Sequence, residues 1–252
     1  MRGLYRWLNI IFFLGMIFIN YLSGSQGLFG RSTREVSDMF HVNVTPAGYA
    51  FLIWSAIYIL LAGFVIVQAL PSKQDNAVIR NIGPWFILSC LFNGTWIFAW
   101  HSVNMGLSTL LIVGLLLTLI VLYIKTRPAA SDSDRVNRWL IALPFSIYMG
   151  WISVASIVNL TIFFSEAGFN GFGLSGEVWA ILLFIIAALL AVFIGIRFND
   201  PYYGLVIVWA LIAIGVEQQE TVPSVTYGAW IVSAFILIFE LIIMAKVVRS
   251  TR

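Results

Sequence analysis

Long apolar runs separated by short polar segments dominate the chain. A helix that crosses a hydrocarbon core of about 30 Å needs about 20 mostly apolar residues. Pro, Gly, Asn and Ser stand at most junctions between the runs, as at Asn199-Asp200-Pro201. The pattern predicts an all-α integral membrane protein with eight transmembrane helices, of which the seventh is the shortest: roughly 4–22, 47–70, 84–101, 106–124, 139–163, 178–196, 202–216 and 224–245.

The basic residues give an independent test of this count, because cytoplasmic loops carry an excess of Lys and Arg. With the N-terminus inside, only Arg31 and Arg34 fall on the outer side. The other twelve of the fourteen basic residues fall on the cytoplasmic side: Arg2, Arg6, Lys73, Arg80, Lys125, Arg127, Arg135, Arg138, Arg197, Lys246, Arg249 and Arg252. We therefore expect a multi-pass protein with both termini in the cytoplasm. Small loops without organellar targeting features favour a bacterial cytoplasmic membrane.

Composition agrees with lipid as the main solvent. Charged residues make up 10% of the chain and apolar residues 61%, whereas globular domains carry about 25% charged residues. The basic residues are scattered between apolar runs, so we expect the lipid bilayer as a partner and no nucleic acid.

The first apolar run admits a second interpretation. Arg2 and Arg6 precede it, as in a secretory signal peptide. Its apolar part is longer than the usual 7–15 residues of such a segment. Asn9 and Asn20 also fit a retained helix better.

Few residues offer catalytic or metal-binding chemistry. No segment has the pattern of a phosphate-binding Gly loop, a nucleophile elbow or a His/carboxylate metal site. His41 and His101 lie far apart in the sequence, at the predicted outer edge of the membrane. We therefore expect no catalytic residue, no metal and no required cofactor, which argues against an enzyme.

Glu240 is the acidic residue that lies well inside a predicted span. A charged side chain at the bilayer centre costs on the order of 3 kcal/mol on insertion scales. Glu240 either relays a proton or cation, or it hydrogen-bonds within the bundle or extends toward the cytoplasmic surface.

Tryptophans recur inside the second, third and fifth predicted spans together with two asparagines. An amide inside the membrane needs a partner, so these faces should point into the bundle. Several indoles with a few amides would form a flat-walled apolar pocket for a planar ligand, but plain bundle packing also explains them. The residues are Trp54, Trp96, Trp100, Trp151, Asn93 and Asn159.

Three segments resemble motifs of the TspO/MBR family, the tryptophan-rich sensory proteins related to the mitochondrial translocator protein. They are 45–58 (TPAGYAFLIWSAIY), 93–96 (NGTW) and 151–159 (WISVASIVN). They are similar to the family's Pro-Pro-Gly-Trp-x-Phe…Trp-Thr-x-x-Tyr, Asn-x-x-Trp and Trp-x-x-Phe-Ala-x-x-Leu-Asn, and they follow the family order. Ala47 replaces the second Pro, and Val154 replaces Phe.

The resemblance implies a five-helix TspO-like bundle over residues 1–163, with three additional transmembrane helices in 164–252. It also implies a cavity that binds porphyrins, and frequent homodimers. Carried over by position, the residues that line or support this cavity would be Trp54, Asn93, Trp96, Trp151, Ala155 and Asn159. Helical adjacency adds Tyr49, Phe51, Tyr58 and Trp100.

The favoured function is a membrane receptor or carrier of TspO type that binds a flat apolar ligand, such as a tetrapyrrole, in a Trp-lined pocket. The alternative is a secondary transporter or permease with proton coupling at Glu240. A third hypothesis is a membrane enzyme that breaks down the bound ligand by tryptophan photochemistry, although nothing in the sequence demands it.

Overall fold

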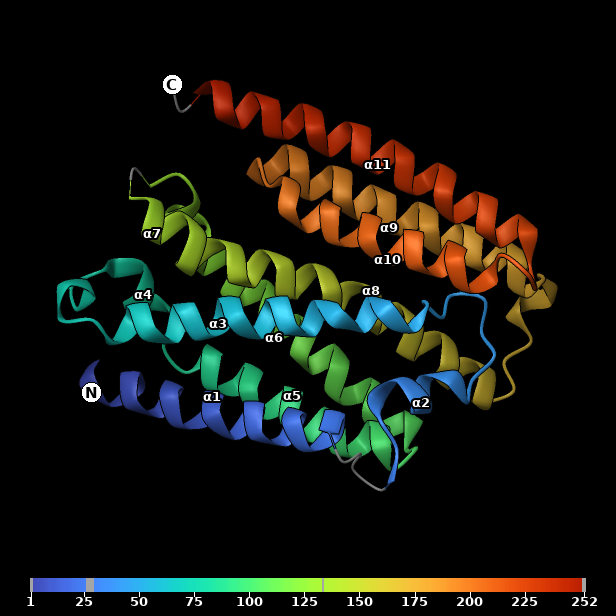
Figure 1. The fold of residues 1–252 in the computed structure, drawn as a ribbon, viewed down its shortest axis with the longest axis horizontal. Coiled ribbons are helices and arrows are strands. Elements are labelled where there is room, and N and C mark those ends of the chain that lie inside the picture. The colour runs from blue at the N-terminus through green and yellow to red at the C-terminus, as the bar shows by residue number, and fades with distance from the viewer. Residues whose placement is uncertain (1, 26–29, 133, 251–252) are drawn as a thin grey trace. The chain divides into compact units, whose positions relative to one another are not determined.

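The computed structural model describes residues 2–25, 30–132 and 134–250, and these form helices without β-strands (Figure 1). The long helices are α1 (Arg2–Ser25), α3 (Ile53–Ala69), α5 (Trp85–His101), α6 (Met105–Ala130), α8 (Leu143–Glu166), α9 (Gly176–Phe198), α10 (Pro201–Gln218) and α11 (Pro223–Ser250). The short α-helices are α2 (Thr33–Asp38), α4 (Ala77–Ile82) and α7 (Arg135–Asn137). The described connections include the 3₁₀ turns η2 (Gly48–Leu52), η3 (Pro71–Lys73) and η5 (Gly171–Gly173) and the π-helical turn η4 (Arg138–Ala142).

Seven helical segments of the described chain are long and apolar enough to cross a membrane. The predicted span that is not among them is the third, which forms α5 and has 17 residues. At about 1.5 Å per residue this helix is about 26 Å long. The all-α membrane fold is confirmed, whereas the count of eight spans is not.

The chain divides into two compact units. The first comprises Met1–Ser37 and Ile53–Ile152, and the second comprises Asp38–Leu52 and Ser153–Arg252. Helix α8 contributes residues to both. The sequence-based division at residue 163 stays a prediction.

Phenylalanines from four helices form the core of the first unit. Phe64 of α3 contacts Phe86 of α5 and Phe145 of α8, with 5.1 Å between ring centroids in each pair. The ring centroid of Phe13 of α1 lies 6.4 Å from that of Phe86. Because α1 packs against both α3 and α5, this aromatic contact fixes the helices that carry the predicted site.

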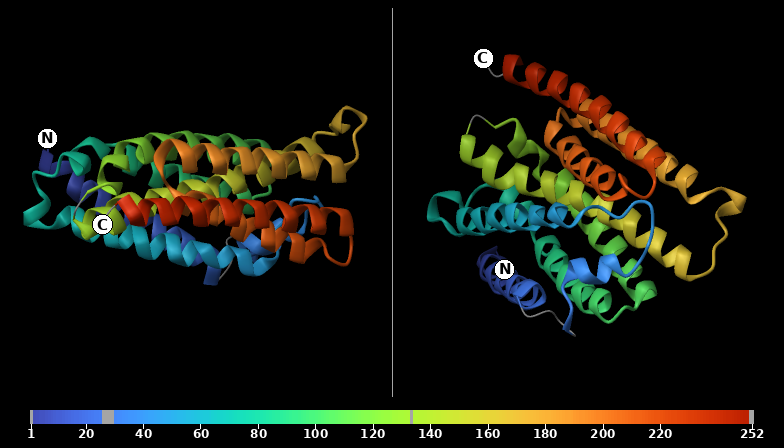
Figure 2. Two further views of the ribbon diagram at one scale, coloured as in Figure 1. Left: turned by 90° about the horizontal axis from the view of Figure 1, so that it is seen from above. Right: turned by 45° about the vertical axis from the view of Figure 1, so that its right-hand side comes forward.

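Helices α9, α10 and α11 pack against one another in the second unit (Figures 1 and 2). Glycines on α10 allow this close approach, as small residues do in membrane helices. A Cβ added at Gly204 would lie 2.0 Å from Oε1 of Glu240 on α11. The segment before α3 is tied to α10 as well, since the Ala47 amide donates to the Ala213 carbonyl at 3.0 Å.

The junction at Asn199-Asp200-Pro201 forms the tight turn that its sequence predicts. Asn199 adopts a left-handed conformation, with φ of 49°, and ends α9. The Asp200 side chain accepts a hydrogen bond from the Tyr202 amide at 3.1 Å and so caps α10. Pro201 occupies the first turn, where it displaces no helical hydrogen bond.

Replacing Gly204 by Ala should destabilise the second unit, because the new methyl group overlaps the Glu240 carboxyl. We expect a loss of about 1–3 kcal/mol in unfolding free energy, measured by denaturation in detergent. Gly15→Ala is the control, since a Cβ there meets nothing within 4 Å. Equal stability of the two variants would contradict the close approach of α10 and α11.

Candidate functional site

A chain of four polar side chains runs through the first unit and joins α1, α3, α5 and α8. The Tyr58 hydroxyl donates to Asn20 Oδ1 at 2.6 Å. Asn20 Nδ2 donates to Asn93 Oδ1 at 2.7 Å, and Asn93 Nδ2 donates to the Tyr148 oxygen at 2.8 Å. Asn93 and Tyr148 are buried, and each of the two amides bonds to side chains of two other helices.

Backbone packing brings the two amides together. A Cβ added at Gly94 would lie 3.2 Å from Cδ1 of Ile19, so α1 and α5 approach closely at the level of Asn20 and Asn93. In apolar surroundings, an amide without a partner loses the hydrogen bonds that water supplied. The network therefore specifies how the four helices align.

The two tyrosines of this network lie against Trp54. The Tyr58 ring stacks on Trp54 at 5.4 Å between centroids, and the Tyr148 ring meets it nearly edge-on at 5.9 Å. The ring centroids of Trp96 and Trp151 each lie 6.4 Å from that of Trp54. Such geometries are favourable between aromatic rings.

We call these rings the aromatic cluster: Trp54, Tyr58, Trp96, Trp100, Tyr148 and Trp151. Trp100 joins by stacking on Trp96 at 5.6 Å. Most of the predicted pocket residues of the first unit, from three different helices, are thus brought together. Asn93 supports the cluster through Tyr148.

Exposure differs within the aromatic cluster. Trp96, Trp100 and Trp151 are buried, whereas Trp54 is half-buried. The Trp96 side chain is only 4% exposed, and its Nε1 has no hydrogen-bond partner in the described part of the chain. Buried indole N–H groups usually find an acceptor, so the Trp96 N–H is an unusual donor for which the described residues supply none.

The other predicted site residues belong to the second unit. Tyr49 meets Trp209 of α10 edge-on, with 5.3 Å between ring centroids. The Trp209 indole donates to the Ala50 carbonyl at 3.1 Å. Phe51, Ala155 and Asn159 also lie in this unit, and Asn159 is buried.

The sequence analysis predicted no site role for three residues of these arrangements, Asn20, Tyr148 and Trp209. Asn20 carried a usable signal, because an amide inside an apolar run needs a polar neighbour. Tyr148 and Trp209 carried none, since an isolated aromatic residue in an apolar run is an ordinary core residue.

His101, the last residue of α5, is buried within the protein. Its Nε2 lies 2.7 Å from Ser23 Oγ and 3.1 Å from Thr33 Oγ1, and the Thr33 carbonyl accepts from Trp100 Nε1 at 3.1 Å. These contacts join the ends of α1, α2 and α5 and fix one edge of the aromatic cluster. His41 is exposed.

Glu240 lies within the second unit and is 0% exposed. Its carboxyl packs against Gly204 of α10 and Gly195 of α9. Neither carboxyl oxygen has a hydrogen-bond partner among the residues that the structure describes. Asp200 is also buried in this unit.

Replacing Asn93 by Leu should destabilise the first unit, because Asn20 and Tyr148 would each lose a partner. We expect a fall of about 1–3 kcal/mol in unfolding free energy, together with a changed tryptophan emission spectrum. Thr95→Ala is the control, since Thr95 is exposed and bonds only to carbonyls of its own helix. Identical melting and emission for both variants would refute the network.

No protein with a curated description and no solved structure matches the chain. A family model described as TSPO-like protein matches residues 6–242. The match does not stop at residue 163, where the sequence analysis placed the end of the TspO-like bundle, but continues into α11. Since it covers far more than half of the sequence, the chain belongs to the TSPO-like protein family.

Proposed function

We propose that this membrane protein is a receptor or carrier that binds a flat apolar ligand of the tetrapyrrole type on the aromatic cluster. The observation that carries the proposal is the buried Trp96 N–H, which lacks an acceptor in the described chain and lies beside Trp54. A ligand carboxylate or carbonyl would supply that acceptor. Trp54, as the less buried indole, would offer its ring face to a planar ligand.

The polar network makes the aromatic cluster a suitable platform. Tyr58 and Tyr148 are each held by hydrogen bonds, and both contact Trp54. Rings fixed before binding lose little conformational freedom when a ligand stacks on them, which favours affinity. Indole walls select flat shape rather than one chemical identity, as a carrier for related tetrapyrroles requires.

Protoporphyrin IX should quench the tryptophan emission of the purified protein and shift its own absorbance on binding. Trp54→Ala should weaken this binding about tenfold, because a ring–ring contact of about 1 kcal/mol and the buried area are lost. Trp96→Phe should also weaken binding, since it keeps a flat ring but removes the N–H.

Trp7→Ala is the matched control, because the Trp7 indole is exposed and outside the aromatic cluster. The proposal fails if protoporphyrin binds Trp54→Ala and Trp96→Phe as tightly as Trp7→Ala. A cytoplasmic location for both termini and a homodimer stay predictions from the sequence.

Glu240 favours a second candidate function, a secondary transporter with proton coupling. An ionised carboxylate without a partner is costly in an apolar interior. The side chain is therefore a candidate for holding a proton that is released when the packing of α9, α10 and α11 changes. The carboxyl occupies the space that Gly195 and Gly204 leave free, since a Cβ added there would lie 3.3 Å from Oε2 and 2.0 Å from Oε1.

Vesicles that contain the protein and a trapped pH dye should acidify when protoporphyrin is added under a membrane potential. Glu240→Gln keeps the side-chain shape but cannot release a proton, so it should abolish this response. Glu177→Gln is the control, because Glu177 lies at the start of α9 and hydrogen-bonds Ser224. Unchanged acidification with Glu240→Gln would remove the transporter hypothesis.

A further inference from the structure

A polar pocket lies in the first unit, apart from the aromatic cluster, where several helix ends meet. It has a volume of about 370 Å³. The start of α1, the end of α3, the turn η3, α4, the start of α5 and the last part of α6 line it. The residues that matter for its chemistry are Arg6, Asn9, Gln68, Lys73, Arg80 and Lys125.

Four of the lining residues are basic and none is acidic: Arg6, Lys73, Arg80 and Lys125. They come from segments up to about 120 residues apart, yet all belong to the side that the charge distribution assigns to the cytoplasm. Like charges this close repel one another unless negative charge is nearby. How far the protein itself supplies that negative charge decides whether the pocket is complete.

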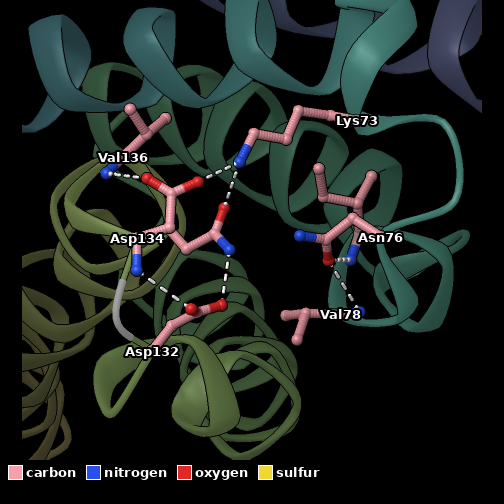
Figure 3. A network of polar contacts seen from close by, with 8 residues as sticks. Lys73, Asn76, Val78, Asp132, Asp134 and Val136 are labelled. Carbon is pink, nitrogen blue, oxygen red and sulfur yellow. Dashed lines mark hydrogen bonds and ion pairs between the residues drawn. The ribbon is translucent and has the colours of Figure 1, made fainter.

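The protein itself neutralises the positive charge of Lys73. Lys73 forms an ion pair with Asp134 (Figure 3). Its Nζ also donates to Asn137 Oδ1 at 2.8 Å. The hydrogen bond from Lys73, aided by the Val136 amide, holds the pKa of Asp134 below its ordinary value. The Asp134 carboxylate therefore stays charged at neutral pH, and Lys73 is not available to a ligand.

The other three basic side chains have weaker negative partners or none among the described residues. Arg80 Nη1 lies 3.9 Å from Oδ1 of Asp75, and the Asp75 side chain is fully exposed to solvent. Arg6 donates to the uncharged carbonyls of Gln68 and Leu70 at 2.7 and 2.9 Å. Lys125 makes no hydrogen bond or ion pair within residues 2–25, 30–132 and 134–250. Arg6 and Lys125 thus carry positive charge that no carboxylate among the described residues pairs with, and the one carboxylate near Arg80 is exposed to water.

A buried acceptor adds a second requirement on the ligand. Asn9 is 3% exposed and donates through Nδ2 to Gln68 Oε1 at 2.9 Å. Its Oδ1 has no hydrogen-bond partner in the described chain. A matching ligand brings both an anionic group for the cations and a hydroxyl or amine donor for this oxygen.

We propose that this pocket binds a phosphate ester that carries a free hydroxyl group. The lipid headgroup is the favoured source, because Tyr5 and Trp85 also line the pocket. Aromatic residues of this kind concentrate at the membrane–water interface, and basic pockets between membrane helices bind anionic headgroups there. Phosphatidylglycerol has both the phosphodiester and the hydroxyl donors. The site goes beyond the proposed function, since it shares no residue with the aromatic cluster.

Phosphatidylglycerol should raise the melting temperature of the detergent-solubilised protein more than phosphatidylcholine does, and native mass spectrometry should find it retained. The Lys125→Gln, Arg80→Gln double variant should bind it about tenfold more weakly, because two charges near the headgroup are lost. Arg80→Lys keeps the charge and should retain the lipid.

Lys246→Gln is the matched control, because it removes an exposed positive charge from α11 in the second unit. A parallel titration with glycerol 3-phosphate separates the sources. Stabilisation by the lipid alone assigns the site to a headgroup, and stabilisation by both assigns it to phosphate esters in general. Equal retention by the double variant and the wild type, or equal loss with Lys246→Gln, would overturn the proposal.

Discussion

The first unit depends on one physical constraint, the need of two asparagines in an apolar bundle to satisfy each other. Asn20 Nδ2 donates to Asn93 Oδ1 at 2.7 Å. Asn20 also accepts a hydrogen bond from the Tyr58 hydroxyl, and Asn93 donates one to the Tyr148 oxygen. Lipid offers amides no alternative partner, so the four helices have few alignments that leave these groups satisfied. The same alignment places Tyr58 and Tyr148 against Trp54. A polar requirement thus sets the geometry of an apolar platform.

The sequence predicts the features of this protein that depend on how apolar and polar residues divide between lipid and water. Apolar run lengths located the ends of the long helices to within about six residues, and the Asn199-Asp200-Pro201 signal marked a true turn. Four of the basic residues, Arg6, Lys73, Arg80 and Lys125, line one pocket, while the orientation of the chain in the membrane stays a prediction. The count of spans was less certain, since α5 ends after 17 residues.

The candidate site was predictable only where a residue type carries its own requirement. Trp54, Trp96 and Trp151 were identified by their recurrence with asparagines, and these rings do converge. Tyr148 was not, because nothing in the sequence distinguishes it from a core aromatic residue. Tyr49 was included by helical adjacency to Trp54, but residues 48–52 form a 3₁₀ turn and Tyr49 contacts Trp209. Adjacency in sequence could not anticipate a partner 160 positions away.

In the proposed function, the indoles around Trp54 form the ligand-binding surface. Fluorine NMR of protein labelled with 5-fluorotryptophan tests it most directly, with each resonance assigned by a single Trp→Phe variant. A bound porphyrin ring shifts nearby nuclei strongly through its ring current. On titration with protoporphyrin IX, the resonances of Trp54, Trp96 and Trp151 should move, while those of the exposed Trp7 and Trp230 should stay in place. Shifts confined to Trp7 and Trp230, with the three cluster resonances unmoved, would contradict the account.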